Sequence, residues 1–108
     1  MASKASTEVM DISKLPLMDE EESRQFVIVV DGHRARMEYD RGGDRIFLTN
    51  IHVPMQLEDK DVSNILTEMV LNWVAANNMK LVPYCPFVKT YLRRNTAWQR
   101  LLVKGVQV

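Results

Sequence analysis

Cysteine is almost absent from this sequence, in which Cys85 is the only one among 108 residues. A disulfide within the chain is therefore excluded, and no apolar leader stands near the start, so we expect a cytoplasmic protein. No run approaches the roughly 18 consecutive apolar residues that a membrane-spanning helix needs. The 14 basic residues balance the 14 acidic ones, which leaves no overall field to attract nucleic acid and no basic block for a membrane surface.

Metal-ligating residues are also scarce. Two histidines, one cysteine and scattered carboxylates show no ligand spacing, so no metal site is predicted. The composition, 46% hydrophobic and 26% charged, is that of an ordinary globular protein. The length allows one domain with a single modest core.

Residues 1–24 are mostly polar and read as a flexible N-terminal extension, which places the folded domain at residues 25–108. The extension contains an isolated apolar patch, Leu15-Pro16-Leu17-Met18. This patch could add a short edge strand or cover part of the core.

Three strands joined by short turns are predicted next. Residues 26–30 form a continuous β-branched run typical of a strand, and Asp31-Gly32 is the strongest hairpin signal in the chain. The second strand alternates Ala35, Met37 and Tyr39 with charged residues. Three such strands would form an antiparallel meander.

The third strand is expected at residues 45–53 and ends at Pro54. Simple alternation divides its side chains into two sets, with Ile46, Leu48 and Asn50 on one face and Phe47, Thr49 and Ile51 on the other.

An amphipathic helix follows, with apolar residues at helical spacing from Val62 to Trp73. Glu58, Asp59 and Asp61 offer capping oxygens at its start, and Asn77-Asn78 is a plausible stop. A short strand at residues 80–84 and a helix at residues 86–94 come next. Because a strand–helix–strand crossover joins parallel neighbours, we predict an α+β fold: a three- to four-stranded antiparallel meander plus one parallel strand, with both helices packed on the sheet.

Cys85 stands between Pro83 and Pro86, at the predicted junction of strand and helix. Proline pushes the preceding residue toward extended geometry and suits the first turn of a helix. Side chains at such strand ends commonly line a ligand crevice. Cys85 is therefore a candidate for chemistry, with a small buried packing residue as the alternative.

The order of these elements, the segment from Arg34 to Tyr39, Val53-Pro54 and the segment from Pro83 to Leu92 together resemble a small single-domain branch of the GNAT-type acetyltransferases. Members of that branch have a Val-Pro before the long helix and a Pro-x-Cys-x-Phe/Tyr-Val segment ending in tyrosine. The resemblance implies that acetyl-CoA is the cofactor, bound in the notch where the parallel strand parts from the meander. It also implies transfer of the acetyl group to an amine.

The resemblance implies roles for particular residues. Cys85 would lie near the thioester as a catalytic residue, and Tyr91 would protonate the departing sulfur. The alternative for Tyr91 is a half-buried amphipathic tyrosine. His52 is a further candidate base. The implied cofactor-binding residues are Val53, Pro54, Met55, Asp59, Lys60, Asp61, Val62, Ser63, Lys89 and Arg93.

One turn departs from the family pattern. The family carries Gly-x-Gly at the start of the long helix, where free amides hold the CoA pyrophosphate. Here the turn reads Glu58-Asp59-Lys60-Asp61, and no glycine occurs between Gly43 and Gly105. Carboxylates at this turn would oppose phosphate and could cap the same amides.

Two functions therefore stay open. One is an acetyl-CoA-dependent N-acetyltransferase whose degenerate phosphate loop weakens or abolishes CoA binding. The other is an inactive GNAT-like module that contacts a protein or another small ligand. An exposed edge of the meander would also allow a weak homodimer.

Overall fold

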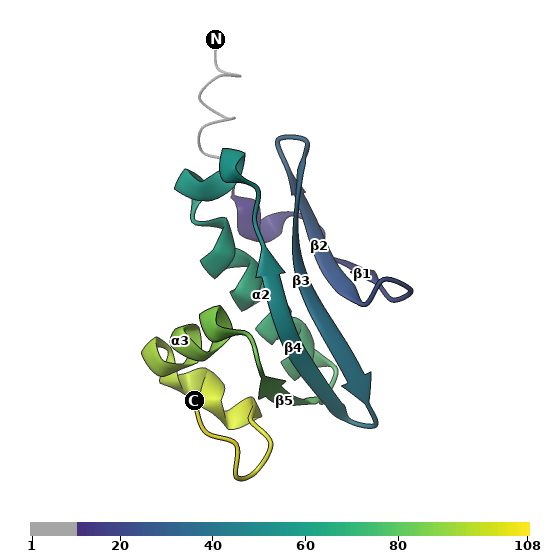
Figure 1. Ribbon diagram of the computed structural model, residues 1–108, viewed down its shortest axis with the longest axis vertical. Coiled ribbons are helices and arrows are strands. Elements are labelled where there is room, and N and C mark those ends of the chain that lie inside the picture. The colour runs from purple at the N-terminus through teal and green to yellow at the C-terminus, as the bar shows by residue number, and fades with distance from the viewer. Residues whose placement is uncertain (1–10) are drawn as a thin grey trace.

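The computed structural model describes residues 11–108, which form one mixed sheet with helices packed against it (Figure 1). The elements in chain order are η1 (Ile12–Lys14), β1 (Met18–Glu20), β2 (Gln25–Val30), β3 (His33–Gly42), β4 (Arg45–His52), η2 (Met55–Lys60), α2 (Val62–Ala76), β5 (Lys80–Pro83), α3 (Pro86–Arg94) and η3 (Thr96–Leu101), where η marks a 3-10 helix.

The five strands lie in the order β1-β2-β3-β4-β5. All neighbouring pairs are antiparallel except β4 and β5, which are parallel and are connected through α2. The predicted α+β class, an antiparallel meander with one added parallel strand, is confirmed. Within residues 11–108, no helix has the length and apolar character needed to cross a membrane.

The segment before β2 contributes to the sheet. β1 pairs with β2 in the register Met18↔Val27, Ile12 is buried, and Leu15 and Leu17 pack against the core. The apolar patch thus supplies both an edge strand and core cover, and residues 11–24 do not form the flexible extension that their polarity predicted. Residues 1–10 of that prediction lie outside the described residues.

Two turns have the conformations that their sequences favour. Asp31 and Gly32 both have positive φ, 50° and 78°, as a two-residue hairpin requires. At the end of α2, Asn78 has a φ of 54°. The amide of Met79 donates to the carbonyl of Val74 at 3.1 Å, and that of Asn78 to Ala75 at 3.2 Å. These two bonds form a Schellman motif at the predicted stop.

The core lies between α2 and one face of the sheet, and α2 runs behind the strands in Figure 1. Phe26 of β2 packs against Tyr39 of β3 and Trp73 of α2, with ring centroids 4.7 and 4.9 Å away. Burying an aliphatic or aromatic side chain of this size contributes about 1.5–3 kcal/mol. The hydroxyl of Tyr39 donates to a carboxylate oxygen of Asp19, which ties β1 to the core.

A β-bulge in β4 corrects the simple alternation predicted for this strand. Glu38 pairs with Asn50 and Tyr39 with Leu48, so Thr49 is an extra residue on β4. After it, Ile51 pairs with Met37 and packs toward the core, while Asn50 is exposed. The predicted face was therefore wrong for Asn50 and Ile51, because one inserted residue shifts the alternation by one.

Candidate functional site

The parallel strands part immediately after Leu48. The last register pair is Leu48↔Pro83, and the Leu48 carbonyl accepts from the amides of both Tyr84 and Cys85 at 2.9 Å. Beyond this point, residues 49–52 of β4 have no β5 neighbour. The bulge at Thr49 bends β4 at the same place. We call this parting of β4 from β5, between the end of β4 and the start of α3, the notch.

Cys85 lies at the junction predicted for it. Its φ of −68° and ψ of 123° are extended, and it is the N-cap residue of α3, which begins with Pro86. Its side chain is 1% exposed and belongs to the core. This burial favours the packing alternative, a small side chain within the core.

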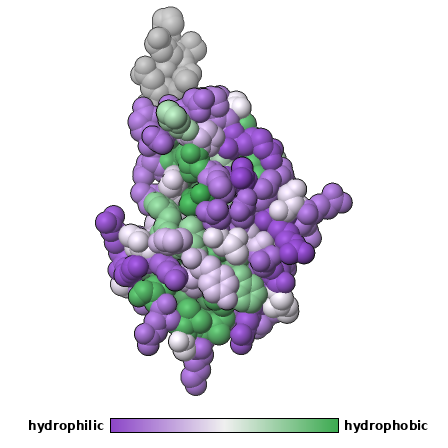
Figure 2. Space-filling model, viewed as in Figure 1, coloured by the Kyte–Doolittle hydropathy of each residue, from purple (hydrophilic) through white to green (hydrophobic). Residues whose placement is uncertain are grey.

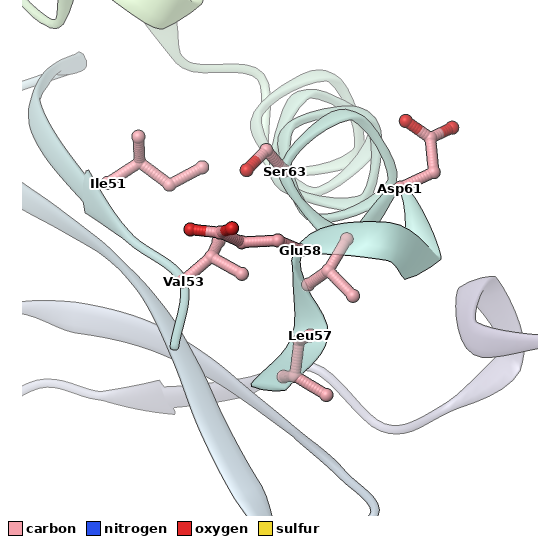
Figure 3. Close-up of a pocket in the computed structure, with 7 residues that line it drawn as sticks. Ile51, Val53, Leu57, Glu58, Asp61 and Ser63 are labelled. Carbon is pink, nitrogen blue, oxygen red and sulfur yellow. The ribbon is translucent and has the colours of Figure 1, made fainter. Parts of the chain in front are cut away.

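A surface cavity of about 260 Å³ lies where β4 ends and α2 begins (Figure 3). Ile51 and Val53 line its strand side, and Leu57 and Val62 add apolar surface. In Figure 3 Glu58 points toward Val53, into the space between β4 and α2. On the face shown in Figure 2, apolar atoms are exposed along the middle between hydrophilic margins.

A second, wider cavity of about 500 Å³ follows α2 toward the end of α3. Tyr91 lines it from α3, with Asn64, Glu68 and Arg94 around it. Asp61 lines both cavities, so the two lie next to each other at the start of α2, and we call the pair of cavities the groove. Burial, and then the negative charges of Glu68 and Asp61, raise the pKa of Tyr91 above its ordinary value.

Asp61 occupies the turn into α2 in a left-handed conformation, with a φ of 57°, the region that glycine prefers. The predicted side-chain cap is not formed, because Asp61 makes no cap hydrogen bond and its carboxylate accepts instead from the Asn64 amide group at 2.7 Å. The expectation that carboxylates occupy the first amides of α2 is therefore wrong for Asp61. The Asp61 side chain therefore leaves the first-turn amides of α2 uncapped.

Lys60 is directed away from the groove. Its Nζ lies 3.7 Å from the Asp31 carboxylate in the β2–β3 turn. Asp59 and Met55 are exposed, Met55 at 78%, and neither lines the groove. Pro54, at the end of β4, is half-buried. The positive charge of Lys60, the one cation in this turn, therefore does little to neutralise the carboxylates of the groove.

Of the remaining implied cofactor residues, Val62 and Ser63 line the first cavity. Lys89 is half-buried and Arg93 is exposed, and neither lines the groove. Arg94, the next residue, does. Sequence reasoning did not place Ile51, Leu57, Glu58, Asn64, Ile65 or Glu68 in the groove. The helical spacing of residues 61, 64, 65 and 68 is the signal that could have found the last three.

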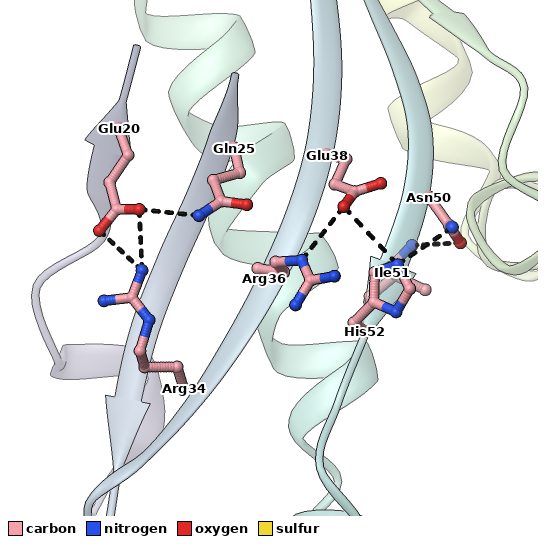
Figure 4. Close-up of polar contacts among 8 residues, drawn as sticks. All are labelled: Glu20, Gln25, Arg34, Arg36, Glu38, Asn50, Ile51 and His52. Atoms are coloured by element: carbon pink, nitrogen blue, oxygen red, sulfur yellow. Dashed lines mark hydrogen bonds and ion pairs between the residues drawn. The ribbon is translucent and has the colours of Figure 1, made fainter. Parts of the chain in front are cut away.

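A polar network covers the sheet face opposite α2 (Figure 4). Arg34 contacts both Glu20 carboxylate oxygens at 2.8 Å. Farther along, Glu38 lies 3.1 Å from the Arg36 Nε and 3.7 Å from the His52 Nε2. These contacts place His52, the candidate base, on the open face of the sheet.

Asn50 connects this network to the notch. Its Nδ2 lies 3.1 Å from the His52 Nε2, and its Oδ1 accepts from the Ile51 amide at 3.0 Å. The Ile51 amide belongs to the part of β4 that has no β5 neighbour. The Asn50 side chain therefore already occupies one backbone donor at the edge of the notch, the amide of Ile51.

The groove fits one end of acetyl-CoA and not the other. The apolar walls of the first cavity and the open edge of β4 fit an acyl-pantetheine arm. The groove does not fit a diphosphate, because three carboxylates line it and only one guanidinium does. The carboxylates are those of Glu58, Asp61 and Glu68, and the guanidinium is that of Arg94. A like-charge pair about 4 Å apart costs about 1 kcal/mol in bulk water and about 4 kcal/mol at an effective dielectric near 20.

Across residues 11–108, no three His, Cys, Asp or Glu side chains gather closely enough to hold a metal ion. The comparison with curated proteins gave no match. Among solved structures, the chain is similar to the solution structure of a GCN5-like protein from Staphylococcus aureus that is proposed to be an N-acetyltransferase. The TM-score is 0.63 at 23% identity, over 84% of this chain and 90% of the other, a likeness of fold.

A comparison with models of protein families identifies the family of this chain. Residues 25–101, well over half of the chain, match the family described as GCN5-related N-acetyl-transferase. The match includes the notch, the groove and the Cys85 segment together. The chain therefore belongs to the GCN5-related N-acetyltransferase family.

Proposed function

We propose that the protein transfers an acetyl group from a thioester to an amine in the notch between β4 and β5. The observation that carries this proposal is the parting of the strands at Leu48, beside a groove that Tyr91 lines. Acetyl-CoA is the donor that the family generally uses. A thioester supplies an activated acyl carbon and a thiol leaving group.

Tyr91 is the proposed proton donor. In the transfer, a bond forms between the amine nitrogen and the acyl carbon, and the carbon–sulfur bond breaks. The departing sulfur takes a proton from the Tyr91 hydroxyl, which every tyrosine carries at neutral pH and which burial and neighbouring carboxylates hold to higher pH by raising the pKa of Tyr91. The proton lost by the amine goes to water.

Cys85 has a structural place in this proposal. Its buried thiol would have to emerge from the core to reach a substrate. We assign it to the wall of the notch, near the thioester, where its small side chain lets the start of α3 pack closely on β4.

The first experiment measures acetyl transfer from acetyl-CoA and from S-acetyl-pantetheine to a panel of primary amines, by mass spectrometry. We expect Tyr91→Phe to lower kcat by about 10²-fold while the melting temperature changes little. Thr90→Ala, at an exposed position on the same helix and outside the groove, controls for changes in α3. Activity of Tyr91→Phe equal to that of the natural protein would remove Tyr91 from the mechanism.

A second candidate is a binding module that has lost CoA and contacts a protein or another small molecule. The observation that favours it is the set of carboxylates lining the groove, Glu58, Asp61 and Glu68. A ligand of the native state must raise the melting temperature. If neither acetyl-CoA nor S-acetyl-pantetheine raises it at millimolar concentration, this candidate replaces the enzyme.

We also propose a compartment for the protein and an edge through which it could pair with a second copy. A single buried thiol suits a reducing cytoplasm. The short edge strand β1, with Met18 36% exposed, is the edge through which a weak homodimer would form.

A further inference from the structure

The charges in the groove are unbalanced. Three carboxylates line it, those of Glu58, Asp61 and Glu68, against the single guanidinium of Arg94. Figure 3 shows that Glu58 extends between the strand end and the helix start. The groove is therefore acidic where a CoA diphosphate would lie against the start of α2.

Two further contacts maintain this imbalance. Asn64 donates to the Asp61 carboxylate at 2.7 Å and holds it at the helix start. Lys60, the cation nearest in sequence, lies 3.7 Å from Asp31 instead. Rotation of Lys60 into the groove would give up that ion pair.

The backbone at the same place is suited to an anion. Asp61 makes no cap hydrogen bond with the first turn of α2, and the free amides of a helix start attract negative groups. The obstacle to a diphosphate is therefore the charge of side chains, since no side-chain oxygen of Asp61 occupies these donors.

The backbone at the start of α2 suits an anion, whereas the carboxylates around it repel one. We infer that the groove selects thioester donors whose carrier lacks a diphosphate. Glu58 and Asp61 are the residues that exclude the CoA nucleotide. The preferred donor class is an acyl thioester on a short uncharged carrier of the pantetheine type, bound along Ile51 and Val53. This inference rests on the proposed function and narrows its donor.

Calorimetric titration of the full chain with CoA and with pantetheine tests the inference without catalysis. We expect the natural protein to bind pantetheine at least as tightly as CoA. In a Glu58→Gln/Asp61→Asn double variant, CoA should gain about tenfold or more in affinity, whereas pantetheine should change less than about twofold. Asp44→Asn removes one negative charge at the β3–β4 turn, away from the groove, and should change neither affinity.

The outcomes separate the inference from the proposed function. CoA binding about tenfold tighter than pantetheine in the natural protein, or no gain of CoA in the double variant, would overturn the inference while the enzyme stands. Absence of binding by both probes in every variant would overturn the enzyme and the inference together. Circular dichroism of each variant confirms that the comparison is between folded proteins.

Discussion

At Asp61, an aspartate holds a backbone conformation that glycine adopts without strain, with a φ of 57°. We predict that Asp61→Gly raises the free energy of unfolding by about 0.5 kcal/mol, and that Asp61→Ala lowers it by about 1 kcal/mol. Urea denaturation measures both. An alanine variant as stable as the glycine variant would show that the strain argument is misplaced here.

Tyr39 provides a second test at single-residue scale. Burial, and then the hydrogen bond and charge of Asp19, raise the pKa of Tyr39 far above its ordinary value, while the unfolded chain keeps a tyrosine pKa of about 10. The unfolded state therefore releases this proton first as the pH rises. The stability that Tyr39 contributes is complete below pH ~10 and is lost as the pH rises beyond it.

We predict that Tyr39→Phe is less stable than the natural protein at pH 7, because the bond to Asp19 is lost, and that its stability falls less steeply above pH ~10. The difference in slope can reach about 1.4 kcal/mol per pH unit. Urea denaturation at intervals of about one unit from about pH 8 to about pH 11 measures it. Parallel curves for the two proteins would contradict the assignment.

Among the elements, β4 determines where the notch opens. Its extra residue, Thr49, turns Ile51 toward the core and lies next to the point where β5 ends. We predict that one alanine inserted after Thr49 costs at least about 2 kcal/mol of stability in urea denaturation, because a second extra residue shifts the alternation beyond the bulge by one and turns Ile51 to the open face. Thr49→Ala keeps the register and should cost less than about 1 kcal/mol. Equal losses in the two variants would mean that the bulge does not set the face of Ile51.

The same strand shows what sequence alone could and could not provide. The start of α3 at Pro86, the stop of α2 at Asn78 and the hairpin at Asp31-Gly32 depend on local chemistry, and all three were predicted. The bulge depends on how β3 and β4 pair across the sheet, and nothing in the alternation of β4 marks Thr49 as the inserted residue. The face of Ile51 was wrong for that reason.

For the whole molecule, the family was recognisable because the spacing of the Val-Pro and Cys85 segments survives in the sequence, and the family match over residues 25–101 confirms it. The composition of the groove was harder to predict. Lys60 was one of the implied cofactor-binding residues, yet its partner, Asp31, lies in a turn far away in sequence. Glu58 was read as a cap, and its place in the cavity follows from the path of η2.

The two sides of the sheet also differ at this scale. One side carries the core and α2, whereas the other carries the network of Arg34, Glu20 and Glu38. The candidate base His52 belongs to that open side, and Tyr91 lines the groove from α3. An amine reaching the notch from the open face would meet a donor lying along the groove, so the sheet would separate the two substrates until they meet beside Leu48.

The central claim is that a thioester binds in the notch and groove. Amide chemical shifts, measured during titration with S-acetyl-pantetheine, test it most directly. The largest shift changes should fall on residues 49–53, 61–64 and 84–91, at the end of β4 and the starts of α2 and α3. The amide shifts of Arg34 and Glu20 should not change. Changes confined to the open face of the sheet, or none anywhere at millimolar ligand, would contradict the account.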